Sequence, residues 1–344
     1  MADASRRADP PPPRINYERE PGAASAPLRA RYRRREPEKT VLHAVVREHL
    51  ETFLDEARER DGDGYPAFVE REFRRYLDCG LLPRGFARLR CPECGFERLV
   101  AFSCKGRLCP SCVGRRMADI AAYLVDDLLP EAPYRQFVLT FPWVLRFRLA
   151  VDRPLFSKLL GAYLRTVFAW QRRRGRALGI RNGQTGAVTF VQRFGGALNL
   201  NPHLHSLVPD GLFVPTEDGS DTLTFVPLPA PTTAVIVALT VKVARRLTAV
   251  VERLCADECE TTEILERTAA ALREALAAAV EPPLSTAGLG LPDLAPPAMD
   301  NALCAKVAGF SLHAARVVGA ADRDGLERLC RYCLLYTSPS PRDL

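Results

Sequence analysis

The spacing of apolar residues divides the chain into a helical first part and a mixed second part. From Thr40 to Asp61, apolar side chains recur every three or four positions, and a second run of this kind covers about residues 66–77. This period puts the apolar side chains on one face of a helix. We therefore predict two helices that pack together, and a third helix over about residues 111–129 that ends before Pro130.

Strand-like runs begin after Pro133. They are short, rich in β-branched and aromatic residues, and bounded by turn residues, which is typical of strands. We predict strands at residues 136–141, 186–194, 199–208, 212–214, 222–226 and 308–314, a long helix at 154–178 and a last helix at 325–333. This order of elements predicts an α+β fold on an antiparallel sheet.

Composition indicates where the domains begin and end. Residues 1–39 are rich in Pro, Arg and Ala, and we expect a disordered basic arm there. Residues 40–130 form the first predicted domain, and residues 131–333 form the second. The amino-acid composition changes over about residues 230–300, where two predicted Ala-rich helices precede a Pro- and Gly-rich linker. We therefore expect a helical insertion in the second domain.

Charge and hydropathy narrow the class of protein. The 48 Lys and Arg exceed the 41 Asp and Glu, giving a net charge of +7 that suits a polyanionic partner. No run of about 18 uncharged apolar residues is present, so no membrane span is expected. The N-terminal residues lack the apolar core of a signal peptide. The eleven cysteines are therefore expected in a reducing compartment, as metal ligands or core residues rather than disulfides.

Two cysteine knuckles stand in the first domain. Each has the form Cys-Pro-x-Cys, and fourteen residues separate them. One knuckle supplies two thiolates at a tight turn, and two knuckles complete a tetrahedral structural zinc site with no position open to water. The predicted zinc ligands are Cys91, Cys94, Cys109 and Cys112.

Two further cysteines and a group of cations lie near these knuckles. Cys104 is an alternate ligand and Cys79 a more distant candidate, while the other interpretation of both is a small buried core residue. A basic surface on a zinc module suits contact with DNA phosphates. The residues predicted to make this contact are Lys105, Arg107, Arg115 and Arg116.

The sequence His203-Leu204-His205 lies in a predicted strand. Side chains alternate between the faces of a strand, so both imidazoles point to the same side. Two neighbouring imidazoles on a rigid strand make a pair of metal ligands. The other interpretation is two polar side chains on a solvated strand face.

These motifs together resemble a known family. The chain resembles the rolling-circle transposases of the insertion-sequence-ninety-one group, including its single-tyrosine members, within the HUH (His, hydrophobic, His) endonuclease superfamily. The resemblance extends over about residues 41–333. It rests on the two knuckles and on residues 85–88, 102–105, 138–142, 189–195, 199–205, 309–314 and 325–332. It implies an N-terminal zinc-binding module followed by an HUH-like antiparallel sheet with flanking helices.

The resemblance also implies a chemistry. The hydroxyl of Tyr332 attacks a phosphodiester of single-stranded DNA, leaving a 5′-phosphotyrosine and a free 3′-OH, so no ATP is needed. The histidine pair holds Mg²⁺ or Mn²⁺, which polarises the scissile phosphate. Such cations prefer oxygen ligands, so a third polar ligand is expected: Gln192 first, and Asp210 as the second choice.

Members of this family differ in the number of tyrosines in the helix that carries Tyr332. Two-tyrosine members carry another tyrosine four residues earlier, where this chain has Arg328. This departure either puts the chain with the single-tyrosine members or leaves its chemistry incomplete. The other interpretation of Tyr332 is a core tyrosine of a terminal helix. Residues 334–344 depart from the family sequence, and we expect them to be a non-native tail of a truncated gene.

Three functions are compatible with these features. The leading hypothesis is a transposase that binds DNA, single-stranded at the element ends, and cleaves and rejoins it through a tyrosine–phosphate intermediate. The second is a non-catalytic, zinc-dependent DNA-binding protein with a structural histidine strand. The third is a plasmid replication initiator or relaxase with the same chemistry. We expect a cytoplasmic location, with nucleoid association when the protein is bound to DNA.

Overall fold

The structure is a computed structural model that describes residues 35–195, 199–216, 222–257, 267, 270–274 and 303–334. Most of the expected N-terminal arm, most of the second helix of the expected insertion and nearly all of the expected tail lie outside these residues. The chain divides into two compact units, Met1–Cys104 and Lys105–Leu344. We predicted a domain boundary near residue 130. Because the boundary between the two units lies at Cys104, the third predicted helix belongs to the second unit.

The first unit is a helical pair followed by a β-hairpin. Its elements are η1 (Pro37–Lys39), α1 (Val41–Asp61), α2 (Ala67–Asp78), η2 (Leu82–Arg84), β1 (Phe86–Arg90) and β2 (Glu97–Ala101). The Thr40 side chain caps α1 by accepting a hydrogen bond from the backbone N–H of His43. Gly62, at φ +76°, ends α1 in a conformation that favours glycine. Both predicted helices are thereby confirmed.

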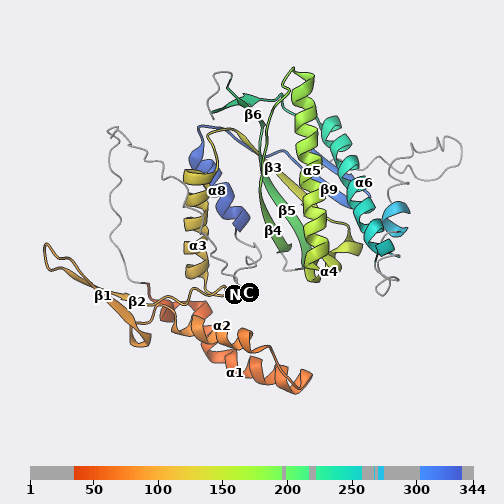
Figure 1. Ribbon diagram of the computed structural model, residues 1–344. Coiled ribbons are helices and arrows are strands. Elements are labelled where there is room, and N and C mark those ends of the chain that lie inside the picture. The colour runs from red at the N-terminus through yellow and green to blue at the C-terminus, as the bar shows by residue number, and fades with distance from the viewer. Residues whose placement is uncertain are drawn as a thin grey trace, which may run out of the picture. The chain divides into compact units, whose positions relative to one another are not determined.

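The second unit contains both helices and strands (Figure 1). In chain order they are α3 (Pro110–Tyr123), the π-helical turn η3 (Leu124–Leu128), β3 (Tyr134–Thr140), α4 (Trp143–Val151), α5 (Arg153–Ala177), β4 (Val188–Phe194), β5 (Leu200–Pro209), β6 (Gly211–Pro215), β7 (Leu223–Pro227), α6 (Thr233–Asp257), β8 (Cys304–Val307), β9 (Phe310–His313), β10 (Val317–Val318) and α8 (Arg323–Leu334). The mixture of helices with antiparallel sheets confirms the α+β class. The hairpin β6–β7 was also predicted, whereas α4 was not.

The main sheet of this unit is antiparallel, in the order β4-β5-β3-β9-β8, with β10 paired to one end of β3. Thr140 on β3 and Gln192 on β4 lie opposite His203 on β5. Directly opposed residues of an antiparallel pair point to the same face of the sheet. The register therefore puts Gln192 on the same face as the histidines, although its sequence neighbours of equal parity are apolar.

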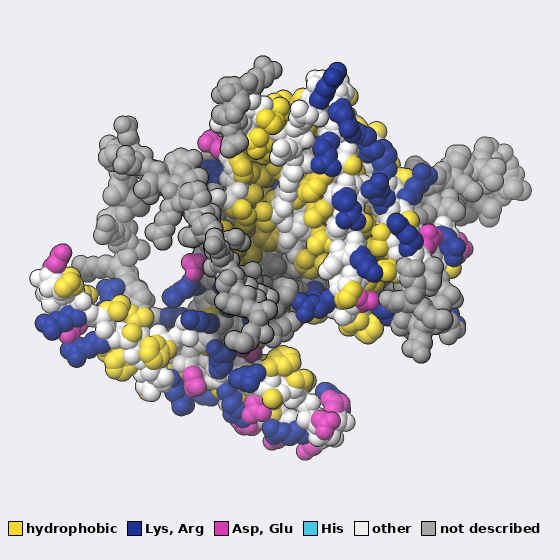
Figure 2. Space-filling view, in the orientation of Figure 1, with side chains coloured by type: hydrophobic (Ala, Val, Ile, Leu, Met, Phe, Trp, Pro, Cys, Tyr) yellow, Lys and Arg dark blue, Asp and Glu magenta, His cyan; other side chains and the backbone are white. Residues whose placement is uncertain are grey.

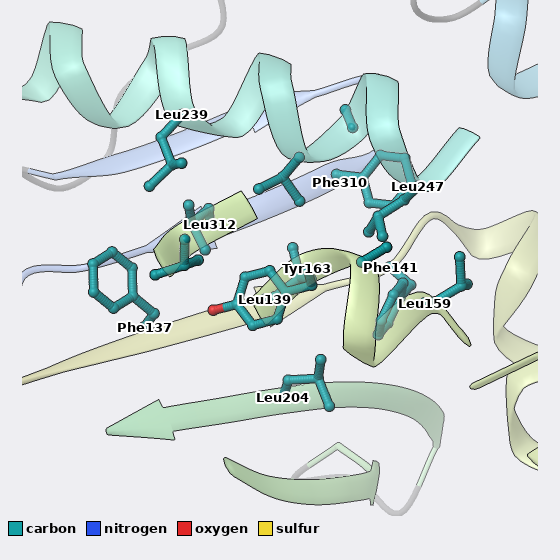
Figure 3. Close-up of a cluster of buried hydrophobic side chains, with 14 of the residues drawn as sticks. Phe137, Leu139, Phe141, Leu159, Tyr163, Leu204, Leu239, Leu247, Phe310 and Leu312 are labelled. Carbon is teal, nitrogen blue, oxygen red and sulfur yellow. The ribbon is translucent and has the colours of Figure 1, made fainter. Parts of the chain in front are cut away.

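One face of the sheet packs against α5 and α6. Figure 3 shows Leu139 and Leu204 projecting from β3 and β5 into a core with Tyr163 of α5 and Leu247 of α6, and all four are buried. Asp152 caps the start of α5, since its side chain accepts a hydrogen bond from the Leu155 backbone N–H at 2.9 Å. The helix α6, which the sequence assigned to an insertion, contributes its apolar face to this core.

The opposite face, which carries the histidines, packs against α3, η3 and α8 (Figure 1). Here Phe190 and Leu207 of the sheet meet Leu329 and Cys333 of α8. The sheet thus lies between two helical layers, and α8 is held over the strand that bears the histidine pair. In the described part of the chain, no helix has the length and apolar character needed to cross a bilayer.

Candidate functional site

Four cysteine thiols form one cluster. Cys79 directly follows α2, Cys109 is the N-cap residue of α3, and Cys112 lies in the first turn of that helix. Together with Cys104, their sulfur atoms all lie within 4.8 Å of one another, and all but Cys112 are buried. A tetrahedral zinc site with Zn–S bonds near 2.3 Å separates its sulfurs by about 3.8 Å. The cluster therefore supports a structural zinc after a small contraction.

The surroundings of the cluster favour thiolates. The backbone N–H of Cys104 and a guanidinium N–H of Arg35 each donate to the Cys79 sulfur at 3.2 Å. The amino end of α3 carries partial positive charge beside Cys109 and Cys112, which also favours negative sulfur. These donors fit a closed structural metal site.

The first knuckle lies elsewhere. Cys91 and Cys94 occupy the turn between β1 and β2, which pair from Phe86–Ala101 at the base to Arg90–Glu97 at the tip. Five strand residues at about 3.3 Å each carry this turn about 16 Å from the base. The structure therefore brings Cys109 and Cys112 together with Cys104 and Cys79, and not with the predicted Cys91 and Cys94.

The Cys91–Cys94 turn still has the features of a knuckle. The Gly95 N–H donates to the Cys91 carbonyl at 3.0 Å, and Gly95 has φ +70°. Backbone N–H groups of Cys94 and Glu93 lower the pKa of the Cys91 thiol. The spacing of the cysteines did not indicate that the two knuckles lie in different places, because strand β1, which precedes Cys91, was not predicted.

The two histidines of β5 lie side by side, with ring centroids 5.0 Å apart. Nδ1 of His203 is 2.6 Å from the Asn201 carbonyl oxygen. A carbonyl only accepts, so Nδ1 carries the proton and the Nε2 lone pair of His203 is available to a metal. Nε2 of His205 is buried and has no hydrogen-bond partner among the described residues, which is uncommon for a buried polar atom.

Both imidazoles are neutral at neutral pH. Burial lowers the pKa of His203, and it lowers the pKa of His205 to about 4 with a further contribution from the neighbouring His203. Only a neutral imidazole has a lone pair to give to a metal. The pair is therefore ready to bind a cation without first losing a proton.

Gln136 is a site residue that the sequence did not indicate. Its amide nitrogen lies 3.0 Å from Nδ1 of His205 and 3.2 Å from the Cys333 sulfur. Metal binding at Nε2 of His205 requires the proton on Nδ1, and a half-turn of the Gln136 amide presents its oxygen to that proton. Burial raises the pKa of Cys333 to about 12, so this thiol keeps its proton and can donate to the same oxygen. The pairing of β3 with β5 places Gln136 beside His205, and the packing of α8 adds Cys333.

Tyr332 lies beside the histidine pair. Its ring centroid is 6.0 Å from that of His205, in a T-shaped contact. The buried side of α8, with Leu329 and Cys333, faces the sheet, while Tyr332 is 58% exposed. This exposure argues against a core tyrosine. Residue Tyr336, further along the chain, lies outside the described residues.

The two candidates for a third ligand differ in position. Gln192 lies opposite His203 and is buried, and its amide N–H donates to the Cys333 carbonyl at 2.9 Å. Asp210 instead receives two hydrogen bonds from the Arg135 guanidinium, at 3.0 and 2.6 Å. Among the described residues, a group of three or more His, Cys, Asp or Glu ligands occurs at the thiol cluster and not at the histidine pair.

The predicted DNA-contact residues are all exposed, at the start of the second unit. Arg116 donates to the Lys105 carbonyl at 2.6 Å, which orders the turn before α3. A larger basic surface runs along α5 and α6, where Figure 2 shows Lys and Arg side chains gathered on the outer face of both helices. This second surface was not assigned from the sequence.

Comparison with known proteins relates two parts of this chain to transposases. Residues 45–141 match the family described as "Transposase zinc-binding domain", whose family name carries the label IS91. Residues 186–336 match the family described as "Putative transposase". The two consecutive matches confirm the resemblance to the insertion-sequence-ninety-one group.

One curated relative shows the same relationship. The "Putative transposase y4qJ" of Sinorhizobium fredii is 30% identical over 129 residues, which are 36% of this chain and 30% of the relative. The chain thus spans less than a third of the length of this relative. No solved structure matches the chain.

Proposed function

We propose that this transposase cleaves and rejoins single strands of DNA through a covalent bond to Tyr332, as required for rolling-circle transposition. The observation that carries the proposal is the position of the exposed Tyr332 ring, 6.0 Å from His205, at the edge of a paired-imidazole site. A nucleophile next to a cation site is the arrangement that phosphoryl transfer requires.

In the proposed reaction, the Tyr332 oxygen attacks phosphorus and loses its proton to solvent. The new bond joins this oxygen to phosphorus, the bond from phosphorus to the 3′ oxygen breaks, and that oxygen leaves as a 3′-OH after gaining a proton. A divalent cation, Mg²⁺ or Mn²⁺, held by His203 and His205 would polarise the phosphate and stabilise charge on the leaving oxygen. The Gln192 amide oxygen is our proposed third ligand, because its N–H is already engaged by Cys333.

The histidine pair gives the test of this proposal. His203→Ala and His205→Ala are each expected to lower cleavage of a single-stranded oligonucleotide by about 10²- to 10³-fold, because several kcal/mol of phosphate activation is lost. DNA affinity without added metal should hardly change. Cleavage is measured on labelled oligonucleotide with Mn²⁺, and binding by anisotropy.

The matched control is His49→Ala, since His49 is exposed on α1. Unchanged cleavage in both site variants would remove the metal role from the pair. DNA binding that depends on zinc, without covalent adduct under any condition, would favour the non-catalytic DNA-binding alternative.

DNA binding is expected to involve the basic face of α5. This helix carries seven Lys and Arg and no Asp or Glu. On α1 and α2, by contrast, cations pair with acids, as Arg74 does with Glu51 and Glu70. An unbalanced cationic face of this kind suits the phosphates of DNA.

Replacing Arg165, Arg172, Arg173 and Arg176 of α5 with Gln is expected to weaken duplex binding. The slope of log affinity against log salt should fall by about 0.9 for each phosphate contact that is lost. The same four positions changed to Lys keep the charge and should retain most of the slope. An unchanged slope in the Gln variant would exclude this face from the DNA interface.

A further inference from the structure

The outer face of α4 exposes large apolar side chains. Trp143 is 77% exposed, Phe147 72% and Val151 62%, and their spacing of four places them in one stripe. Leu145 and Leu149 of the same helix are buried. A Trp is rarely exposed to this extent on a surface that binds nothing.

The stripe begins next to the histidine pair. Thr140, opposite His203 in the sheet, is separated from Trp143 by only two residues. The helix α4 packs against β5, and Arg193 of β4 donates to the Ala150 carbonyl at 2.6 Å, which fixes the far end of α4. The whole stripe is therefore anchored to the strands that carry the proposed cation site.

A cation lies within the stripe. The Arg146 guanidinium is 5.6 Å from the centre of the Trp143 ring and donates to the Phe141 carbonyl at 3.3 Å. The same guanidinium is near enough to His203 to act on it electrostatically. Aromatic rings interleaved with a guanidinium can bind bases and phosphates together.

We infer that Trp143 and Phe147 stack on unpaired bases of the DNA strand that enters the His203–His205–Tyr332 site, while Arg146 contacts its backbone phosphate. This inference rests on the proposed function and names the residues that select single-stranded substrate. Bases in a duplex already stack on each other, so only a single strand can offer them to the two rings.

A second copy of the chain fits the stripe less well. Three side chains of this size bury a few hundred Å² at most, whereas a stable interface buries about 1,200 Å² or more. The guanidinium among them would also need a partner on the opposing surface. Single-stranded DNA meets both the apolar and the charged requirement.

Intrinsic fluorescence of the full chain provides the test. The protein has two Trp, and Trp170 is only 7% exposed, so the signal from Trp143 can be isolated with Trp170→Phe. Without added divalent metal, a dT oligomer should quench this signal, and a matched duplex should not. In Trp143→Phe the signal that remains, from Trp170, should be insensitive to the oligomer.

Affinity measurements complete the test. Trp143→Ala should weaken binding of the dT oligomer between about fivefold and 100-fold, with duplex affinity unchanged, since stacking on one side chain contributes about that factor per base. Trp143→Phe should recover most of the affinity, and circular dichroism should show that both variants fold.

Two outcomes would overturn the inference. One is no quenching together with wild-type affinity of Trp143→Ala for the oligomer; the other is a change of oligomeric state in Trp143→Ala without a change in affinity. Either result leaves Tyr332 chemistry intact, because adduct formation is measured separately. Quenching in a protein that forms no adduct would instead reject the proposed function and retain the DNA surface.

Discussion

Replacement of Tyr332 with Phe is expected to abolish the covalent protein–DNA adduct. The substitution removes one hydroxyl and leaves the ring, so the T-shaped contact with His205 and the packing of α8 persist. Loss of the nucleophile should reduce strand cleavage by about three orders of magnitude or more, as nucleophile deletions do in other covalent catalysts. The measurement is labelled oligonucleotide that co-migrates with protein in a denaturing gel after incubation with Mn²⁺.

The matched control is Tyr123→Phe. Tyr123 is exposed at the end of α3, and it should form adduct like the wild type. Adduct of normal yield in Tyr332→Phe would remove this residue from the chemistry, and peptide mapping of the adduct would then locate the true attachment point. Equal thermal stability of the two variants would show that a loss of adduct is chemical and not a folding defect.

Arg328, one helical turn before Tyr332, affects how many covalent bonds to DNA are expected. Arg328 stands where two-tyrosine members have their second tyrosine, and its exposed guanidinium lies 3.8 Å from the Asp322 carboxylate. Its guanidinium offers no hydroxyl that could attack phosphorus. One covalent attachment per active site is therefore expected.

Replacement of Cys79 with Ser is expected to remove zinc from the protein. Structural zinc sites contribute about 10–16 kcal/mol of binding energy that is also folding energy, so loss of one ligand is severe. Cys79 is one of the four clustered thiols. The thermal midpoint should fall by about 10 °C or more. Metal analysis of the purified protein and thermal unfolding provide the two measurements.

The control is Cys91→Ser, which changes a thiol at the exposed tip of the β1–β2 hairpin. This variant should keep its structural zinc and most of its stability. The opposite pattern, with zinc lost in Cys91→Ser and kept in Cys79→Ser, would restore the pairing of the two knuckles that their spacing suggested. Cys104→Ser should behave like Cys79→Ser.

Local patterns of apolar residues were enough to predict most of the helices and strands. The period of apolar residues located α1, α2 and α5, since each side chain in a helix faces the core or the solvent according to its immediate neighbours. Alternation along β5 placed His203 and His205 on one face, which the structure confirms. α4 was missed because it has only nine residues and exposes part of its apolar surface.

Contacts between distant segments decided the sites. The amide of Gln136 meets His205 across 69 residues, and Tyr332 comes to His205 from the last described helix. Such contacts depend on strand order and on which face a helix covers, and neither is written in the spacing of a motif.

The sequence by itself thus determined the class of protein, the histidine pair, the tyrosine-bearing helix and the presence of a cysteine-rich zinc module. Only the tertiary structure decided which four thiols converge, because an unpredicted strand before Cys91 turns the first knuckle into a hairpin tip. It likewise decided that Gln192 lies on the same face of the sheet as the histidines and that Trp143 stays exposed. Local periodicity depends on adjacent residues, whereas ligand sets depend on long-range pairing that folding alone establishes.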